Sequence, residues 1–229
     1  MNIETFNTLP LADYRRKLWR HDATVAHTHS GASRTYSLLL ESSSTLSHKD
    51  FRACFNLITS TSSGDYEGSS MGWSAAKKWK EMRLPDLRYI VLKQKEDDKG
   101  QDELSEVEGF LSFMLTYEDG HEVIYCYEIH LSPRLQGTGL GKRFMEMMEE
   151  VGKKASVKKA MLTVFKANEA AIRFYERLGY EEDEYSPRPR KLRGGVVKEP
   201  DYMILSKPLA GESRSLNRKS GLVKKRKAR

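Results

Sequence analysis

The protein has 229 residues, of which 38% are hydrophobic and 31% are charged, so it can form one domain with a hydrophobic core. No uncharged apolar run approaches about 18 residues, which excludes a membrane-spanning helix, and residues 1–20 lack the hydrophobic stretch of a signal peptide. The two cysteines, Cys54 and Cys126, are too few for a disulfide framework and lack the spacing of a zinc site. We therefore expect a protein of a reducing compartment, with no membrane contact and no metal.

The net charge of +7 is concentrated at the C-terminus. Residues 211–229 contain eight Lys or Arg residues and a single acid, Glu212, so residues 1–210 are neutral. This composition predicts a disordered tail over residues 209–229. The basic run at 224–227 is typical of a nuclear-import signal or of a weak contact with polyanions, although a solvated tail without a role is the alternative. Nucleus and cytoplasm are the expected locations, and the neutral remainder argues against a DNA-binding domain.

Hydrophobic periodicity predicts elements from residue 35 onward, whereas the polar residues 1–34 predict none. Strands are expected at 35–41, 89–95, 107–117, 122–131, 160–165 and 202–206, and helices at 47–58, 74–83, 140–151 and 169–178. Ser47, followed three residues later by Asp50, resembles a capping box, and Asp119 with Gly120 predicts a hairpin turn. This order predicts a mixed α/β domain.

Two connections are long. The charged residues 96–104 predict a loop, and residues 185–200, with three prolines and several basic residues, predict a mobile flap. The chain therefore divides into an N-terminal segment of uncertain structure at 1–34, one domain at 35–208, and the basic tail at 209–229.

A glycine-rich turn at 136–141, QGTGLG, lies between a predicted strand and a predicted helix. Free backbone N–H groups and the helix dipole favour an anion there, and glycine lets the backbone approach phosphate oxygens closely. A Walker A loop would need glycine in place of Gln136 and a hydroxyl in place of Arg143, and the spacing also differs from the Rossmann GxGxxG pattern. The turn alone fits either an anion site or a tight structural loop.

The turn resembles the Q/R-x-x-G-x-G/A motif of the GCN5-related N-acetyltransferase (GNAT) superfamily, and residues 168–180, NEAAIRFYERLGY, resemble a second feature of that family. The resemblance implies an α/β (α+β) GNAT fold, a single domain with a mixed central sheet flanked by helices, and acetyl-CoA as acetyl donor. The implied acetyl-CoA contacts are Ile129, Leu131, Gln136, Gly137, Thr138, Gly139, Leu140, Gly141, Lys142, Asn168, Ala171 and Tyr175.

A closer resemblance covers residues 45–206. Segments 66–73, 122–144 and 161–171 are similar to the NatD family of N-alpha-acetyltransferases, which act on histone N-termini. This implies transfer of acetyl to the α-amine of histone 4 and histone 2A, whose ends read Ser-Gly-Arg-Gly, and we expect a monomer. The implied substrate-binding residues are Tyr66, Trp73, Glu118, Tyr125 and Tyr127.

Two positions depart from that family. Thr116 stands where histone-specific relatives carry an acid, while Glu118 keeps another acidic place, and Met71 stands where an aromatic residue is expected. Substrate binding is therefore expected to rest on Glu118 and on the acidic run at 181–184, for which a solvated loop is the alternative.

Acetyl transfer needs a neutral amine and a proton for the departing thiolate. A peptide α-amine has a pKa of about 8, against about 10.4 for Lys, so it needs only mild help from a base. Glu128, in the predicted strand just before the glycine turn, is the candidate base, with Tyr127 beside it as a further catalytic candidate. The resemblance implies Tyr175 as the acid that protonates the CoA sulfur. Surface exposure of Glu128 and core packing of the tyrosines are the structural alternatives.

Strict strand alternation would place Tyr125 and Tyr127 on one face and Glu128 on the other. A β-bulge is required for all three to line one cleft. Cys126 as a nucleophile is disfavoured because no histidine partner is evident. The alternatives to a histone enzyme are a less selective protein or small-amine acetyltransferase and a non-catalytic chromatin-binding protein of the same fold.

Overall fold

The computed structural model describes residues 2–19, 24–29, 32–95, 107–191, 193, 195 and 197–209. The predicted loop at 96–104 and residues 210–229 of the tail lie outside the described residues. No helix in the described ranges is long and apolar enough to cross a membrane.

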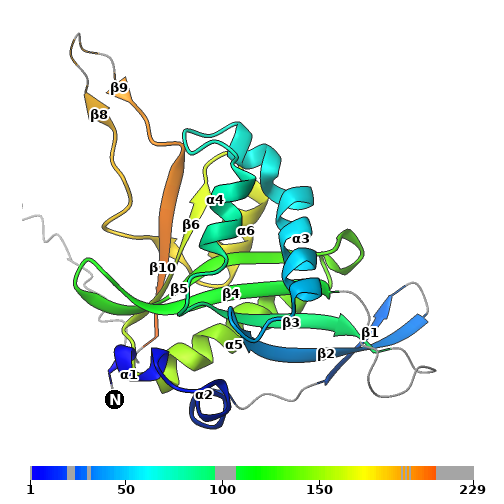
Figure 1. Cartoon of the computed structure of the whole chain (residues 1–229). Coiled ribbons are helices and arrows are strands. Elements are labelled where there is room, and N and C mark those ends of the chain that lie inside the picture. Colours follow the sequence, from blue (N-terminus) through cyan, green and yellow to red (C-terminus); the bar gives the residue numbers. More distant parts are fainter. Residues whose placement is uncertain are drawn as a thin grey trace, which may run out of the picture.

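An eight-stranded sheet forms the centre of the domain (Figure 1). Its strand order is β1-β2-β3-β4-β5-β6-β10-β7, and every neighbouring pair is antiparallel except β5 and β6. The strands are β1 (Thr24–His29), β2 (Ala32–Ser42), β3 (Arg88–Gln94), β4 (Val107–Glu118), β5 (His121–Leu131), β6 (Lys159–Phe165), β7 (Glu181–Glu182) and β10 (Tyr202–Pro208). The six predicted strands are therefore confirmed, most of them extended by one to four residues.

The helices are α1 (Ile3–Asn7), α2 (Leu11–Leu18), α3 (His48–Glu67), α4 (Ala75–Glu81), α5 (Leu140–Lys154) and α6 (Glu169–Arg177). Ser47 caps α3 by accepting from the Asp50 backbone N–H, as predicted, but the Asp50 carboxylate accepts from the Ser47 hydroxyl rather than from the Ser47 backbone. Asp119 and Gly120 have positive φ angles of 48° and 76°, as the predicted hairpin turn requires.

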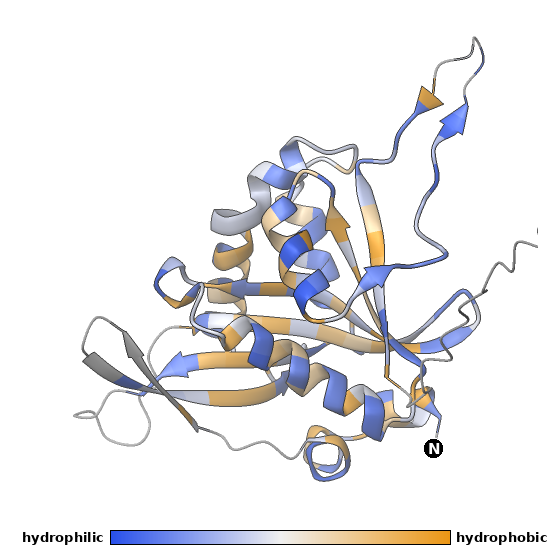
Figure 2. Ribbon diagram, turned by 180° about the vertical axis from the view of Figure 1, so that it is seen from behind, coloured by the Kyte–Doolittle hydropathy of each residue, from blue (hydrophilic) through white to orange (hydrophobic). Residues whose placement is uncertain are grey.

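Two hydrophobic clusters cover the two faces of the sheet. In the α5 cluster, helices α1, α2, α5 and α6 pack with Ile90, Phe113 and Ile124. In the α3 cluster, on the other face, helices α3 and α4 pack with Tyr89, Val91 and Phe110. Figure 2 shows the apolar strands between these helices. The alternation of side chains along β3 and β4 divides them between the two clusters.

Helices α1 and α2 were not predicted, because their apolar residues are few and spread through a polar segment. Ile3, Phe6, Tyr14 and Leu18 are nevertheless buried in the α5 cluster. The Arg88 guanidinium donates to the Asn7 carbonyl at 2.9 Å, which ties α1 to the sheet. The proposed boundary at residue 34 falls within β2, and these helices share the core of the domain.

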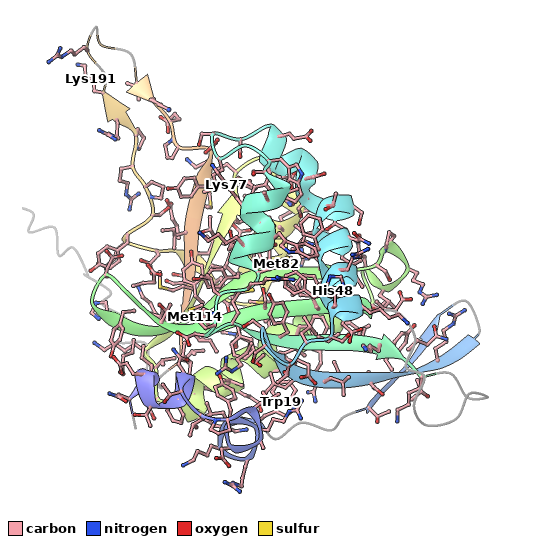
Figure 3. All side chains as sticks on the ribbon, in the orientation of Figure 1. Trp19, His48, Lys77, Met82, Met114 and Lys191 are labelled. Atoms are coloured by element: carbon pink, nitrogen blue, oxygen red, sulfur yellow. The ribbon has the colours of Figure 1, made fainter. Side chains whose placement is uncertain are left out.

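The predicted flap at 185–200 contains a short hairpin of β8 (Arg190–Lys191) and β9 (Val197–Lys198), which projects from the domain (Figures 1 and 3). Its described residues from Arg188 to Lys191 are exposed. A paired ladder thus occurs where only a loop was expected.

Candidate active site

A β-bulge in β5 is the central feature of the site. Ser112 of β4 pairs with Glu128, whereas the next residue, Phe113, pairs with Cys126, so Tyr127 has no partner in the ladder. The bulge shifts the alternation by one residue, so that Tyr127 and Glu128 both face the α3 side of the sheet. Tyr125 lies on the same face, with its ring centroid 5.6 Å from that of Tyr127. The bulge required by the sequence is therefore present.

Strands β5 and β6 separate beyond the bulge. Their pairing ends at Cys126 and Leu162, although β5 continues to Leu131 and β6 to Phe165. The gap between them opens into a cavity of about 120 Å³. Its lining includes the candidate residues Tyr66, Tyr127, Glu128, Ile129, Asn168, Ala171 and Tyr175, together with His130 and Asp65. Predicted residues from three separate segments thus meet at one opening.

Glu128 is buried and both its carboxylate oxygens are engaged. Oε1 accepts from Lys78 Nζ at 2.7 Å and from the Tyr66 hydroxyl at 3.3 Å, and Oε2 lies 2.7 Å from His130 Nε2. Burial alone would raise the pKa of this carboxyl group, but the hydrogen bonds and charges of His130 and Lys78 outweigh burial and lower the pKa to about 2. Glu128 is therefore a carboxylate at neutral pH, and it is not a surface residue.

His130 is held from its other side by α3. Its Nδ1 lies 2.6 Å from Thr61 Oγ1, and the Thr61 hydroxyl also lies 2.7 Å from the Leu57 carbonyl, to which it can donate. The imidazole thus bridges a helix hydroxyl and the Glu128 carboxylate, in a buried position beside the Phe110 ring. This chain of contacts fixes the orientation of the carboxylate.

The glycine-rich turn has the geometry of an anion site. Gly137 and Gly139 have φ angles of 73° and 87°, and a Cβ added at either would meet no atom within 4 Å. Gly139 precedes α5 without a side-chain cap, and none of the backbone N–H groups from Gly137 to Lys142 has a partner among the described residues. These free donors at the start of a 15-residue helix fit the pyrophosphate of acetyl-CoA.

Other residues of the turn maintain its shape. Gln136 Nε2 donates to the Leu131 carbonyl at 3.2 Å, and Thr138 Oγ1 donates to the Leu135 carbonyl at 2.6 Å. Leu140 is buried, whereas Lys142 is exposed and lies 3.7 Å from Glu146. Ile129 and Leu131 pack at the edge of the α5 cluster, on the face of β5 opposite Glu128.

Helix α6 lies beside this turn. Phe174 approaches Gly141 so closely that a Cβ there would be 3.3 Å from the Phe174 ring. Asn168 caps α6, because its Oδ1 accepts from the Ala171 N–H at 3.0 Å, and its Nδ2 donates to Asp65 at 2.9 Å. Tyr175 is buried at the cavity wall, and burial raises its pKa well above the ordinary value. Its hydroxyl therefore keeps its proton at neutral pH.

The predicted substrate residues gather on the α3 side of β5. Tyr66 contacts the rings of Trp73 and Phe165, with centroids 5.6 and 4.9 Å away. The Tyr125 hydroxyl lies 2.6 Å from Thr163 Oγ1. Glu118 is half-buried at the end of β4, where burial and then Asp119 raise its pKa. Burial raises the pKa of Tyr125 and of Tyr127, and the charge of Glu118 adds to this effect.

The structure bears on three sequence-based interpretations and changes the first of them. The acidic run at 181–184 begins as strand β7, and Asp183 within it is buried 2.6 Å from Lys159, so it is neither a solvated loop nor entirely available to a ligand. Met71, which stands where the family carries an aromatic residue, is 49% exposed. Cys126 is buried, and burial raises the pKa of its thiol, which argues further against a nucleophilic role.

Sequence reasoning missed Lys78, Thr61 and His130. Lys78 and Thr61 lie on helices far along the chain from Glu128, so no local pattern connects them. His130 had one available signal: two residues after Glu128, it shares that residue's face of the strand.

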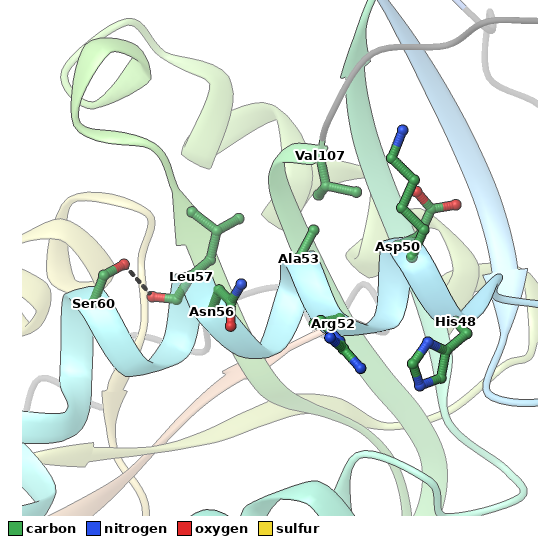
Figure 4. A pocket seen from close by; sticks show the side chains of 9 residues that line it. His48, Asp50, Arg52, Ala53, Asn56, Leu57, Ser60 and Val107 are labelled. Atoms are coloured by element: carbon green, nitrogen blue, oxygen red, sulfur yellow. Dashed lines mark hydrogen bonds between the residues drawn. The ribbon is translucent and has the colours of Figure 1, made fainter.

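A second, larger cavity of about 630 Å³ lies along α3 and is lined by His48, Lys49, Asp50, Arg52, Ala53, Asn56, Leu57, Ser60 and Val107 (Figure 4). Asp50 is committed to Lys93 at 2.7 Å. None of the predicted site residues is among the described residues that line this cavity.

Known proteins resemble this chain in sequence and in fold. The yeast Saccharomyces cerevisiae protein N-alpha-acetyltransferase 40 is 32% identical, over 60% of this chain and 53% of its own length, so the chain spans about half of that relative. The PaiA N-acetyltransferase of Thermoplasma acidophilum, solved in complex with coenzyme A, superposes with a TM-score of 0.50 at 16% identity, covering 75% of this chain and 99% of PaiA. PH1933 of Pyrococcus horikoshii gives a TM-score of 0.50 at 17% identity, with 75% and 98% covered.

These two structures share the fold, at identities too low to indicate more. The sequence of residues 51–180, which include most of α3, the bulged β5, the glycine turn and α6, matches the Acetyltransferase (GNAT) family. Because this match covers more than half of the chain, the protein belongs to the Acetyltransferase (GNAT) family.

Proposed function

We propose that this acetyltransferase moves the acetyl group of acetyl-CoA to the N-terminal α-amine of histone 4 and histone 2A, whose ends read Ser-Gly-Arg-Gly. Acetyl-CoA is the acetyl donor of the family, as expected from the sequence. The observation that carries the proposal is the bulge in β5, which brings the Glu128 carboxylate and the Tyr127 ring to the gap between β5 and β6. The glycine turn, whose backbone N–H groups are free among the described residues, follows β5 and leads into α5.

The reaction needs an attacking amine, a base and an acid at this gap. The α-amine nitrogen attacks the thioester carbonyl carbon, a C–N bond forms, and the C–S bond breaks. Glu128 takes the proton that the nitrogen loses, and the Tyr175 hydroxyl gives its proton to the departing thiolate. Both groups line the same cavity, on strand β5 and helix α6.

The low pKa of Glu128 limits what it has to do. About a tenth of peptide α-amines are already neutral at pH 7, so the base need not deprotonate a free ammonium. The nitrogen becomes far more acidic once it has attacked the carbonyl carbon, and a carboxylate with a pKa of about 2 then suffices if it is well placed or acts through a water molecule.

The acceptor side favours a short, small N-terminus. Tyr66 and Trp73 come from the end of α3 and the loop after it, while Tyr125 and Tyr127 come from the sheet, so aromatic rings approach the gap from two sides. Glu118, half-buried on the same face, offers a carboxylate to the Arg at the third position of the peptide. The name of the yeast relative, an N-alpha-acetyltransferase, agrees with an α-amine acceptor.

A peptide experiment tests this proposal. The full chain is incubated with acetyl-CoA and a peptide that begins Ser-Gly-Arg-Gly and contains an internal Lys, and mass spectrometry locates the acetyl group. Acetylation at the first nitrogen alone is expected, and a peptide with Leu at position three should bind more weakly by about 1 to 3 kcal/mol. Acetylation of the internal Lys, or equal rates on peptides beginning Met-Glu, would support the less selective acetyltransferase instead.

A non-catalytic chromatin-binding protein is the remaining alternative. The intact turn at Gly139, the buried Tyr175 and the engaged carboxylate of Glu128 favour an enzyme. Absence of any acetyl transfer to peptides or small amines, in a protein that binds acetyl-CoA, would favour the scaffold.

A further inference from the structure

Lys78 is the most completely engaged cation at the site. Its side chain is 7% exposed, and its Nζ donates to Glu128 Oε1 at 2.7 Å, to Glu81 Oε1 at 2.8 Å and to the Tyr66 hydroxyl at 2.9 Å. An ammonium group has three N–H donors, so all three are used. Its Nζ also lies 4.7 Å from the centre of the Tyr66 ring.

A buried ammonium is costly unless carboxylates compensate it. Here Glu128 and the partly exposed Glu81 do so, and although burial opposes the charge, they and Tyr66 raise the pKa of Lys78 above its ordinary value. Lys78 therefore stays charged at any working pH. The apolar packing at α4 comes from Trp79 and from Met82, which follows the helix, so Lys78 is not needed for that packing.

Lys78 connects the loop between α3 and α4 to the Glu128 carboxylate on β5. Tyr66 belongs to the last turn of α3, Lys78 belongs to α4, and the loop between them carries Met71 and Trp73. The Lys78 ammonium joins both ends of this loop to Glu128 on β5. His130 restrains the opposite oxygen of the same carboxylate, so Glu128 is held from two sides.

We propose that Lys78 is a positioning residue of the acetyl-transfer site, which holds the Glu128 carboxylate and the Tyr66 hydroxyl in the arrangement that receives the acceptor amine. The proposal rests on the proposed function for its kinetic consequence, but the ion pair itself can be measured without any substrate.

The ion pair also governs the protonation of the carboxylate. Removal of the Lys78 charge should raise the pKa of Glu128, because Lys78 lowers it through both its charge and its hydrogen bond. Besides Lys78, the titratable groups of the described residues that contact Glu128 or interact with its charge are Tyr66 on α3, Tyr89 on β3, Cys126 and His130 on β5, and Tyr175 on α6, while Glu81 on α4 shares the Lys78 ammonium with it.

Three variants separate positioning from general stability. Lys78→Met removes the charge and the donors, Lys78→Gln removes the charge but keeps an amide donor, and Lys80→Met is the matched control on the exposed side of α4. Each full-length variant is checked for acetyl-CoA affinity by calorimetry and for kcat and KM on the Ser-Gly-Arg-Gly peptide. The pKa of the Glu128 carboxyl group is followed by carbon-13 NMR with labelled glutamate.

We expect Lys78→Met to lower kcat/KM about 10²-fold, the usual effect of a base displaced by about 1 Å, while acetyl-CoA affinity stays near that of the wild type. Lys78→Gln should recover part of this loss, and Lys80→Met should match the wild type. The Glu128 titration should move to higher pH in both Lys78 variants and remain in place in Lys80→Met.

A folded Lys78→Met or Lys78→Gln protein with wild-type kcat/KM and an unmoved Glu128 titration would overturn the proposal. If neither variant folds, the wild type decides: a Glu128 carboxyl group that titrates near its ordinary value of 4.5 would show that no such ion pair exists. A wild-type enzyme that leaves the peptide unmodified would reject the proposed function, whereas the NMR titrations would still judge Lys78.

Discussion

Tyr125 and Glu128 face the same side of the sheet although three positions separate them, because Tyr127 between them is bulged out of the ladder. In a regular strand an odd separation places two side chains on opposite faces. Without the extra residue, Glu128 would face the opposite side of the sheet from Tyr125. With it, the Glu128 carboxylate lies 2.7 Å from Lys78.

Glu128→Gln should lower kcat by about 10² or more, because the amide cannot take the amine proton. Acetyl-CoA affinity should change little, since the glycine turn is untouched. Glu122→Gln, on the same strand but bonded to Tyr117 at 3.3 Å, is the matched control and should keep normal turnover. Steady-state kinetics on the Ser-Gly-Arg-Gly peptide measures both. Near-normal turnover of Glu128→Gln would mean that another group or solvent takes the proton.

His130→Leu and His130→Gln should differ, because only glutamine can donate an N–H group to Glu128. Loss of the donor leaves a buried carboxylate oxygen unpaired, which costs about 1 to 3 kcal/mol in the free energy of unfolding. We expect that cost and a severe loss of kcat in His130→Leu, and a much smaller loss of each in His130→Gln. Urea denaturation and kinetics are the measurements, and equal behaviour of the two variants would contradict the hydrogen-bonding role.

Gly139→Arg should abolish acetyl-CoA binding, because its side chain would occupy the open space beside the free N–H groups of the turn. Gly120→Arg is the control: Gly120 also has a positive φ, of 76°, and no atom within 4 Å of an added Cβ, but it lies in the β4–β5 hairpin turn. Both variants carry similar backbone strain, so calorimetry of the folded proteins isolates the effect on the donor site. Equal acetyl-CoA affinities of the two variants would contradict a phosphate-binding role for the turn.

Acid should destabilise the wild type more than Glu128→Gln. The pKa of Glu128 is about 2 in the folded protein and about 4.5 when unperturbed, so its ionised form stabilises the fold above about pH 4.5 and this stabilisation is lost as pH falls toward 2. The shift corresponds to at most about 3 kcal/mol. Between pH 5 and pH 2.5, the free energy of unfolding should therefore fall more for the wild type than for Glu128→Gln. An equal fall in the two proteins would contradict the depressed pKa of Glu128.

Local patterns in the sequence predicted most of the elements that build the site. Alternating and helical periodicities located β2 to β6, α3 to α6 and β10, because each carries enough apolar residues to mark its own buried face. The turn at 136–141 was recognisable for a similar reason: Gly137 and Gly139 adopt positive φ angles that other residues rarely take. The family motif then added the expected ligand.

Long-range contacts decided the rest. Helices α1 and α2 form because Ile3, Phe6, Tyr14 and Leu18 meet the surface of α5 and the sheet, a partner that their own polar segment does not indicate. The carboxylate of Glu128 depends on Lys78 and Tyr66, which are 50 and 62 residues away along the chain. Whether Glu128 faces this cluster or the α5 side depends on the register between β4 and β5, which the bulge sets. Residue types and their spacing therefore determined the candidates, whereas strand register and helix packing determined which of them share one site.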